Sequence, residues 1–162
     1  MKYIFLDVDG VLNNKKHYSK QHKKYGGRFF CEDMPFNPKS LVNLKKIIKK
    51  TGAKVVLSSS WRRTTNGMIV LKARLMEYGI KIHSTTPHID GYRGKEIKKW
   101  CEDNIKAEDR ILIIDDEMYD IEEFFKTNEI VKVNYNNGLN SIKKYESIKK
   151  LNRKEKKVWM KK

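Results

Sequence analysis

Two aspartates lie close together near the start of the chain, in the segment IFLDVDGVLN at residues 4–13. Asp7 and Asp9 follow directly after a short apolar run, and Gly10 allows the chain to turn sharply behind them. A carboxylate in the position of Asp7 can attack phosphorus as a nucleophile. A second carboxylate two residues later can protonate the leaving oxygen and then activate water. The spacing therefore favours covalent and acid–base chemistry at this pair.

A second group of aspartates comes late in the chain. Asp115, Asp116 and Asp120 follow the apolar run RILII at residues 110–114. Carboxylates from both groups would repel one another strongly if they met, unless a cation lay between them. Hard oxygen ligands of this kind suit Mg²⁺, which also binds phosphate. The sequence therefore predicts a magnesium site that uses both groups.

Hydroxyl and basic side chains that could bind a phosphate lie between the two acidic groups. Three serines at 58–60 follow the apolar run KVVL, and Ser58 or Ser59 can donate its hydroxyl to a phosphoryl oxygen. Lys95 lies at the start of the helical segment GKEIKKWCED, where its ammonium and the helix N-terminus both attract an anion. We predict that these residues bind the phosphate and that Arg62 is a further substrate contact. The cations that compete with Lys95 for this role are Arg93, Lys98 and Lys99.

The elements that position these side chains are indicated by short apolar runs. Five runs bounded by polar turns predict buried parallel strands at residues 3–6, 54–57, 80–82, 110–114 and 130–133. Helical spacing of apolar residues predicts helices at 38–50, 68–78 and 94–105. This alternation is typical of a Rossmann-like, doubly wound α/β sandwich of three layers around a mostly parallel sheet. In such sheets ligands bind at the carboxyl ends of the strands, where the acids and serines lie.

One domain at residues 1–150 accounts for all these elements. The basic segment 13–36 has no strand or helix period, and such a connection is often a flap or binding loop. Residues 151–162 are predicted to form a basic tail. We see no internal repeat.

The net charge of +16 is concentrated in two stretches, because residues 13–30 contribute +6 and residues 143–162 contribute +8. Such charge attracts a polyanion such as nucleic acid. A lysine-rich composition with the lysines in solvent explains the same numbers, and both interpretations stay open. Two cysteines, Cys31 and Cys101, are too few for a disulfide framework and lack zinc-site spacing. We therefore expect a soluble, cytoplasmic monomer with no membrane partner.

Four motifs in this order resemble the haloacid dehalogenase (HAD) superfamily of phosphotransferases: DVDGVLN, VVLSSSWR, Lys95 and IIDDEMYD. The resemblance covers roughly residues 3–140. It implies an aspartyl-phosphate mechanism with Asp7 as nucleophile, Asp9 as acid and base, and Mg²⁺ as cofactor. The metal ligands it implies are Asp7, the backbone carbonyl of Asp9, and Asp116. Asp120 would support them, and Asp115 is a neighbour whose role is left open.

Softer motifs point to a narrower group. SSSWR, RGKEIKKW and ILIIDDEMYDI, followed by VNYNNGL, resemble HAD phosphatases linked with nucleic-acid end repair, such as the phosphatase half of polynucleotide kinase-phosphatases. The chain departs from many HAD proteins in having no long cap segment between Ser60 and Asp115. We therefore expect a capless or minimally capped site, which would be open to large substrates such as phosphorylated nucleic-acid ends.

Three other functions would use some of the same motifs or the same charge. A phosphatase acting on nucleotides or other small phosphate esters would use the same motifs. A basic nucleic-acid-binding module with a non-catalytic HAD core would need no metal, yet the acids are intact. A response-regulator receiver domain is disfavoured, because there the acidic pair follows the first strand and the phosphoacceptor lies on a middle strand, whereas here the DxD comes first.

Overall fold

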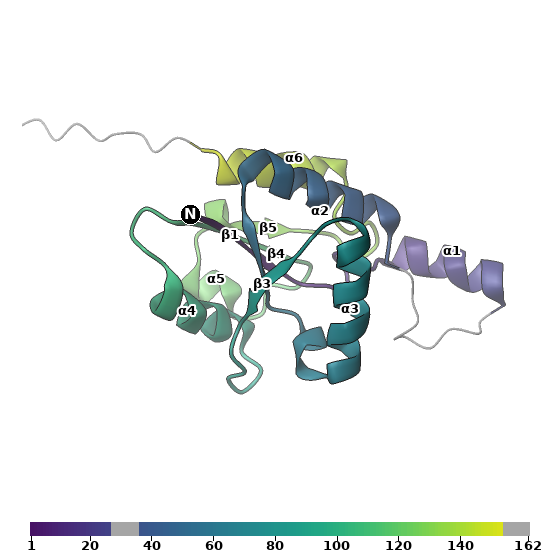
Figure 1. The fold of residues 1–162 in the computed structure, drawn as a ribbon, viewed down its shortest axis with the longest axis horizontal. Coiled ribbons are helices and arrows are strands. Elements are labelled where there is room, and N and C mark those ends of the chain that lie inside the picture. The colour runs from purple at the N-terminus through teal and green to yellow at the C-terminus, as the bar shows by residue number, and fades with distance from the viewer. Residues whose placement is uncertain (27–35, 154–162) are drawn as a thin grey trace, which may run out of the picture.

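A five-stranded sheet forms the centre of the structure, a computed structural model that describes residues 1–26 and 36–153 (Figure 1). The sheet order is β3-β2-β1-β4-β5, and every neighbouring pair is parallel. The chain therefore starts at the centre of the sheet and winds outwards in both directions, which confirms the predicted doubly wound α/β fold. The strands are β1 (Lys2–Leu6), β2 (Lys54–Leu57), β3 (Ile82–Thr85), β4 (Arg110–Asp115) and β5 (Ile130–Lys132).

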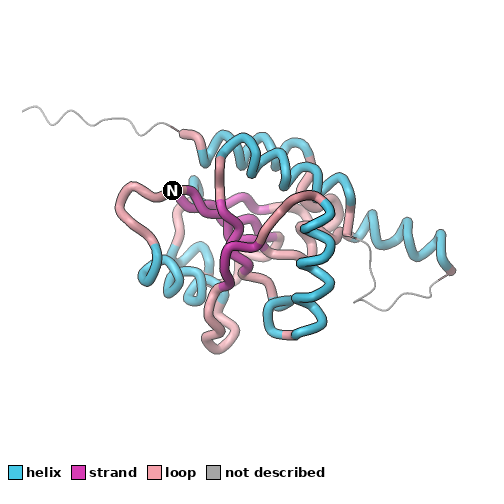
Figure 2. Tube along the Cα trace, viewed as in Figure 1, coloured by secondary structure: helices cyan, strands magenta, loops and turns pink. Residues whose placement is uncertain are grey.

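Helices cover both faces of the sheet (Figure 2). Helices α2 (Pro38–Thr51), α3 (Thr65–Glu77) and α6 (Ser141–Leu151) pack on one face, and α4 (Arg93–Asn104) and α5 (Ile121–Phe124) pack on the other. Alternate side chains of β1 enter the two cores, Ile4 and Leu6 on the first face and Tyr3 and Phe5 on the second. The sheet is therefore buried on both faces, as its continuous apolar runs predict. The described residues also form two short 3-10 helices, η2 (Ser60–Arg63) and η3 (Thr127–Glu129).

Local sequence signals fix the ends of α2. The side chain of Asn37 accepts a hydrogen bond from the backbone N–H of Lys39 at 3.0 Å, and Pro38 occupies the first turn. Gly52 ends the helix in the left-handed conformation with φ +68°. The predicted cap, first turn and stop of this helix are confirmed.

Helix α1 (Lys15–Tyr25) corrects the prediction that segment 13–36 lacks secondary structure. Asn14 caps its start and Gly26 ends it, but none of its residues is buried, so it carries no apolar stripe that periodicity could detect. The helix projects from the body of the protein (Figure 1). Backbone hydrogen bonds from its first two residues to the carbonyls of Tyr135 and Asn136 anchor it there. Residues 27–35 of the predicted flap lie outside the described residues.

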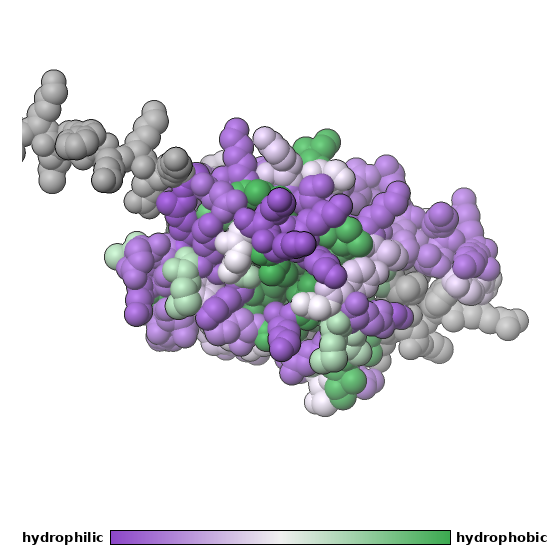
Figure 3. Space-filling model, turned by 45° about the horizontal axis from the view of Figure 1, so that its top comes forward, coloured by the Kyte–Doolittle hydropathy of each residue, from purple (hydrophilic) through white to green (hydrophobic). Residues whose placement is uncertain are grey.

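The face that carries α2 and α6 is mostly hydrophilic (Figure 3). Leu151, the last residue of α6, is buried in the core. Residues 154–162 of the predicted tail lie outside the described residues. In the described part of the chain, no helix is long and apolar enough to cross a membrane.

Candidate active site

Three strands end at the same edge of the sheet and deliver polar side chains there. In the parallel register Leu6 of β1 pairs with Leu57 of β2 and with Ile114 of β4. The hydrogen-bond ladder continues beyond these pairs, because the N–H of Asp7 donates to Ile114 at 3.0 Å and the N–H of Ser58 donates to Leu6 at 3.1 Å. Asp7, Ser58 and Asp115 therefore lie side by side, as the strand-end argument predicts.

Three aspartates converge at this edge. Each of Asp7, Asp115 and Asp116 offers a carboxylate oxygen, and these atoms all lie within 4.8 Å of one another. Asp116 lies directly over Gly10, where a Cβ would come within 2.2 Å of the Asp116 Cγ. Gly10 also has φ +71°, so both the close approach and the backbone conformation require glycine. Three hard oxygen ligands fit a divalent cation such as Mg²⁺.

The carboxyl groups resist ionisation in the absence of a cation. Burial raises the pKa of Asp7 above its ordinary value, against the opposing effect of Arg93. Burial and then the neighbouring Asp7 raise the pKa of Asp115 to about 7, and the same two causes raise the pKa of Asp116 to about 6. One guanidinium cannot offset three clustered carboxylates, two of them buried, so a further cation would stabilise the ionised site.

Arg93 is the basic residue beside the nucleophile position, whereas Lys95 was predicted there. Its Nη1 lies 2.9 Å from Asp7 Oδ1 and 2.5 Å from Asp115 Oδ2. Burial alone would lower the pKa of Arg93, but the two carboxylates outweigh it and hold the guanidinium charged. The Nζ of Lys95 instead lies 4.2 Å from the centre of the Tyr92 ring, outside the acidic site.

Helical periodicity was the signal that could have identified Arg93. Arg93 lies one helical turn before Ile97 and two turns before Trp100. Because both of these residues are buried, Arg93 belongs to the inward-facing side of α4. Lys95 lies two residues further along, on the exposed side with Lys98 and Lys99.

Asp120 supports the site by capping α4. Its carboxylate accepts the N–H of Gly94 at 2.8 Å and the N–H of Lys95 at 3.0 Å. Its backbone is equally close, since a Cβ at Gly94 would lie 2.6 Å from the Asp120 carbonyl oxygen. The N-terminus of α4 is therefore occupied by a carboxylate, which corrects the expectation that it binds phosphate. Asp120 fixes the helix that carries Arg93.

The carboxylate of Asp9 is hydrogen-bonded to residues outside the group of three clustered acids. Oδ2 accepts a hydrogen bond from the Trp61 indole N–H at 2.8 Å, and Oδ1 accepts one from the Asn13 amide at 3.4 Å. Its side chain is therefore separate from the metal-ligand cluster, where the resemblance placed only its backbone carbonyl. Trp61 and Asn13 were not predicted as site residues.

The predicted serines lie beside Asp7 and are fully buried. The Ser58 hydroxyl has no hydrogen-bond partner among the described residues, and such a buried hydroxyl costs free energy unless something binds it. The neighbouring Ser59 hydroxyl lowers the pKa of Asp7 and so opposes burial, which raises it. Both hydroxyls lie at the edge of the sheet that carries Asp7.

Arg62 was predicted to contact the substrate, and the structure contradicts this. Its side chain is only 5% exposed, and all of its donor groups are engaged. Nη1 donates to the carbonyls of Ser58 and Ser59, each at 2.7 Å, while Nη2 pairs with the buried Glu96 at 2.5 Å. Arg62 therefore clamps the serine turn onto α4. No local pattern indicated this contact, because 34 residues separate the two partners.

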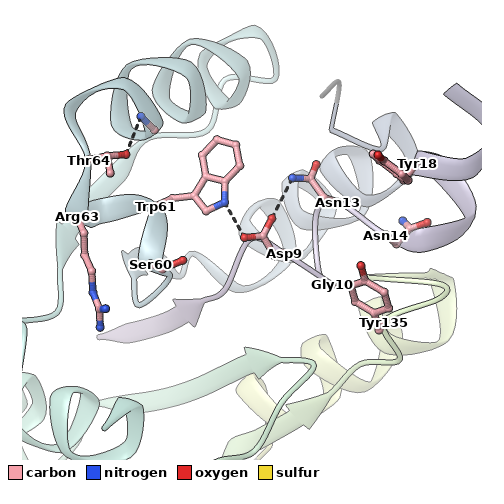
Figure 4. Close-up of a pocket in the computed structure, with 11 residues that line it drawn as sticks. Asp9, Gly10, Asn13, Asn14, Tyr18, Ser60, Trp61, Arg63, Thr64 and Tyr135 are labelled. Carbon is pink, nitrogen blue, oxygen red and sulfur yellow. Dashed lines mark hydrogen bonds between the residues drawn. The ribbon is translucent and has the colours of Figure 1, made fainter. Parts of the chain in front are cut away.

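Two adjoining cavities open at this edge. The first, here called the acid cavity, has a volume of about 510 Å³ and contains Asp7, Arg93 and the clustered acids. The second, here called the aromatic cavity, has a volume of about 630 Å³ (Figure 4). Both are lined by Asp9, Ser60 and Tyr135. The remaining residues of the aromatic cavity are Gly10, Asn13, Asn14, Tyr18, Trp61, Arg63, Thr64 and Gly67.

Comparison with known proteins identifies a family. The family model described as "HAD domain in Swiss Army Knife RNA repair proteins" matches residues 3–143 of the 162-residue chain. No curated protein and no solved structure matches the chain. The matched segment contains every strand of the sheet and every acid of the site. The chain therefore belongs to the family of HAD domains found in Swiss Army Knife RNA repair proteins.

Proposed function

We propose that this protein is an Mg²⁺-dependent phosphomonoesterase that removes terminal phosphates from RNA through an aspartyl-phosphate on Asp7. The observation that carries the proposal is the meeting of Asp7 with Arg93 and two further aspartates beside the buried serine hydroxyls. Asp7, Asp115 and Asp116 would hold Mg²⁺. The bound ion would offset the repulsion between the carboxylates and the phosphate.

In the first step, an Asp7 carboxylate oxygen forms a bond to phosphorus while the bond from phosphorus to the leaving oxygen breaks. Arg93 and the hydroxyls of Ser58 and Ser59 donate to the phosphoryl oxygens. Asp9 gives its proton to the leaving oxygen, which departs as a neutral hydroxyl. Trp61 supports this role, because its hydrogen bond orients the Asp9 carboxylate.

In the second step, a water molecule attacks the phosphorus of the aspartyl-phosphate. Asp9 accepts a proton from this water, and the bond from phosphorus to the Asp7 oxygen breaks. The products are inorganic phosphate and the regenerated carboxylate. Asp9 exchanges one proton in each step, so its protonation state is restored after a full cycle.

An RNA substrate is favoured by the family and by charge. Helix α1 carries five lysines and no acidic residue, and all five are exposed. Four of them, Lys15, Lys16, Lys20 and Lys23, line a groove together with Asn136, the neighbour of Tyr135 at the site. This groove would hold the phosphates behind the RNA end.

The test is phosphate release with and without Mg²⁺ from 3′- and 5′-phosphorylated oligoribonucleotides and from nucleoside monophosphates. We expect release from an oligoribonucleotide that needs Mg²⁺ and is lost in Asp7→Asn. Release from monophosphates alone would support a nucleotide phosphatase instead. Absence of release from every substrate would contradict the proposal and favour a binding module.

Salt dependence tests the polymer contact separately. Binding of the oligoribonucleotide should weaken as the salt concentration rises. The slope of the logarithm of the binding constant against the logarithm of the salt concentration should become shallower by about 0.7 for each lysine contact removed. The variant Lys20→Glu with Lys23→Glu should show this loss. Lys45→Glu with Lys46→Glu, which changes the same charge on the exposed side of α2, should not. Equal losses in both variants would contradict a specific role for α1.

A further inference from the structure

The aromatic cavity has no role in the phosphoryl chemistry, yet it opens directly beside it. We infer that it binds the nucleoside that carries the scissile phosphate, with the base against its aromatic side chains. The inference rests on the proposed function, because it names what leaves when the phosphate is transferred to Asp7.

The position of Asp9 decides where the leaving group goes. An acid that protonates the leaving oxygen must touch it, so the leaving group extends away from phosphorus past Asp9. Asp9 lies on the boundary between the two cavities, and its carboxylate faces Trp61 and Asn13, which line the aromatic cavity only. The group attached to the leaving oxygen therefore enters the aromatic cavity.

The cavity wall suits a nucleobase. Three aromatic side chains line it from three separate elements: Tyr18 on α1, Trp61 on η2 and Tyr135 after β5. Figure 4 shows Trp61 on one side and Tyr18 and Tyr135 on the other, with Asp9 between them. The volume of about 630 Å³ lies within the range of about 300–1,000 Å³ typical of small-ligand sites. Aromatic side chains offer every base a stacking surface without selecting one sequence.

Two buried amides give the cavity a polar end. Asn13 is 5% exposed and Asn14 is 3% exposed, and both line the cavity. The Oδ1 of Asn13 and the Nδ2 of Asn14 have no hydrogen-bond partner within residues 1–26 and 36–153. Buried amide groups are almost always hydrogen-bonded to protein, water or ligand, so these two atoms have a hydrogen bond to offer to what enters the cavity. One acceptor and one donor match the mixed edge of a base or a ribose hydroxyl.

The cavity and the lysine groove draw on the same two parts of the chain. Tyr135 lines the cavity and its neighbour Asn136 lines the groove, while α1 contributes Tyr18 to the cavity and four lysines to the groove. With its terminal nucleoside in the cavity, the rest of the RNA strand would thus run along α1. The same arrangement places the terminal phosphate in the acid cavity, next to Asp7.

The test compares two ligands that differ only in the base: adenosine monophosphate and ribose phosphate with the phosphate on the same hydroxyl, as both 3′ and 5′ isomers. Affinities are measured by calorimetry on Asp7→Asn in the presence of Mg²⁺, so that no turnover interferes. We expect at least one isomer of the nucleotide to bind about 10-fold tighter than its ribose counterpart. In Tyr18→Ala and in Tyr135→Ala, each made in the Asp7→Asn background, this ratio should fall toward one.

Tyr145→Ala is the matched control, because Tyr145 is an exposed tyrosine on α6 outside both cavities. It should keep the ratio of the parent protein. Equal binding of nucleotide and ribose phosphate in the parent, or a ratio unchanged in both cavity variants, would overturn the inference. Phosphate release by the wild-type protein is measured separately, so a failure of the proposed function would appear there and not in the binding ratio.

Discussion

Arg93 and Asp7 face each other in the acid cavity, with Nη1 of the arginine 2.9 Å from Oδ1 of the aspartate. The same nitrogen contacts Asp115, so one guanidinium bridges two of the three clustered acids. A phosphoryl group on Asp7 would bring its oxygens within reach of that guanidinium. Arg93 is therefore a counter-ion for Asp7 and Asp115, and under the proposed function it would also bind the transferred phosphate.

Replacing Arg93 should cost much more activity than replacing Lys95. A preorganised donor to the transferring phosphoryl group typically contributes about 10²–10³-fold in rate. Arg93→Ala should therefore lower kcat for phosphate release by about that factor. Lys95→Ala should stay within a few-fold, because its ammonium lies over Tyr92. Steady-state kinetics on a phosphorylated oligoribonucleotide decides, and a larger loss in Lys95→Ala would restore the sequence-based assignment.

Four of the strands and the first acids could be predicted because the signals that carry them are local. Strand β3 lies at Ile82–Thr85 and not at 80–82, because it is only partly buried and has no continuous apolar run. A buried parallel strand is a continuous apolar run, so the sequence located Asp7 and Asp115 at strand ends. Helix α1 escaped because a fully exposed helix has no apolar period. The pairing of Arg62 with Glu96 escaped because α3, β3 and their connecting loops separate the two residues, and no local pattern specifies which buried charges meet.

The metal-free protein should lose stability as the pH rises through the range in which the clustered acids ionise. Their pKa values are raised by folding, to about 7 for Asp115 and about 6 for Asp116, so the folded state binds more protons than the unfolded state between about pH 4 and pH 7. These groups therefore stabilise the folded state fully below their ordinary pKa. This stabilisation is lost as the pH rises through their raised pKa in the folded state.

Thermal unfolding in a chelator at pH 5 and pH 8 measures this effect, with Asp115→Asn as the reference. The stability of the wild type relative to the variant should fall from pH 5 to pH 8. Added Mg²⁺ should restore the wild type at pH 8 more than at pH 5, because ionised carboxylates bind the ion. A wild type that gains on the variant as the pH rises would contradict the cluster's electrostatics.

Gly10→Ala should weaken the metal site specifically. The new Cβ would overlap the Asp116 carboxylate, and displacing a group that holds a metal ligand typically costs about 10–100-fold in affinity. Gly52→Ala is the matched control, since Gly52 has a similar φ of +68° but no atom within 4 Å of an added Cβ. Both should lose about 1–2 kcal/mol of stability from backbone strain. Only Gly10→Ala should need more Mg²⁺ for half-maximal activity, and an equal requirement in the two variants would refute this.

Arg62→Ala should destabilise the fold through the serine turn. Removing one partner of a buried ion pair typically costs about 3–5 kcal/mol. Here the loss would remove the Arg62 donors from Glu96 and from the carbonyls of Ser58 and Ser59, while Arg63 and the Ile89 N–H would still contact Glu96. Arg74→Ala breaks an exposed pair with Glu77 and should cost less than about 1 kcal/mol. Denaturant unfolding of the two variants measures the difference, and similar values would mean that the clamp contributes little.

Under the proposed mechanism, Asp7 carries the phosphoryl group during turnover. The most direct measurement is mass analysis of peptides after acid quenching of the protein with Mg²⁺ and a phosphorylated oligoribonucleotide. We expect one added phosphoryl group on the peptide that contains Asp7 and none in Asp7→Asn. Phosphate release without any phosphorylated peptide, or release that survives in Asp7→Asn, would contradict a phosphoryl group carried by Asp7.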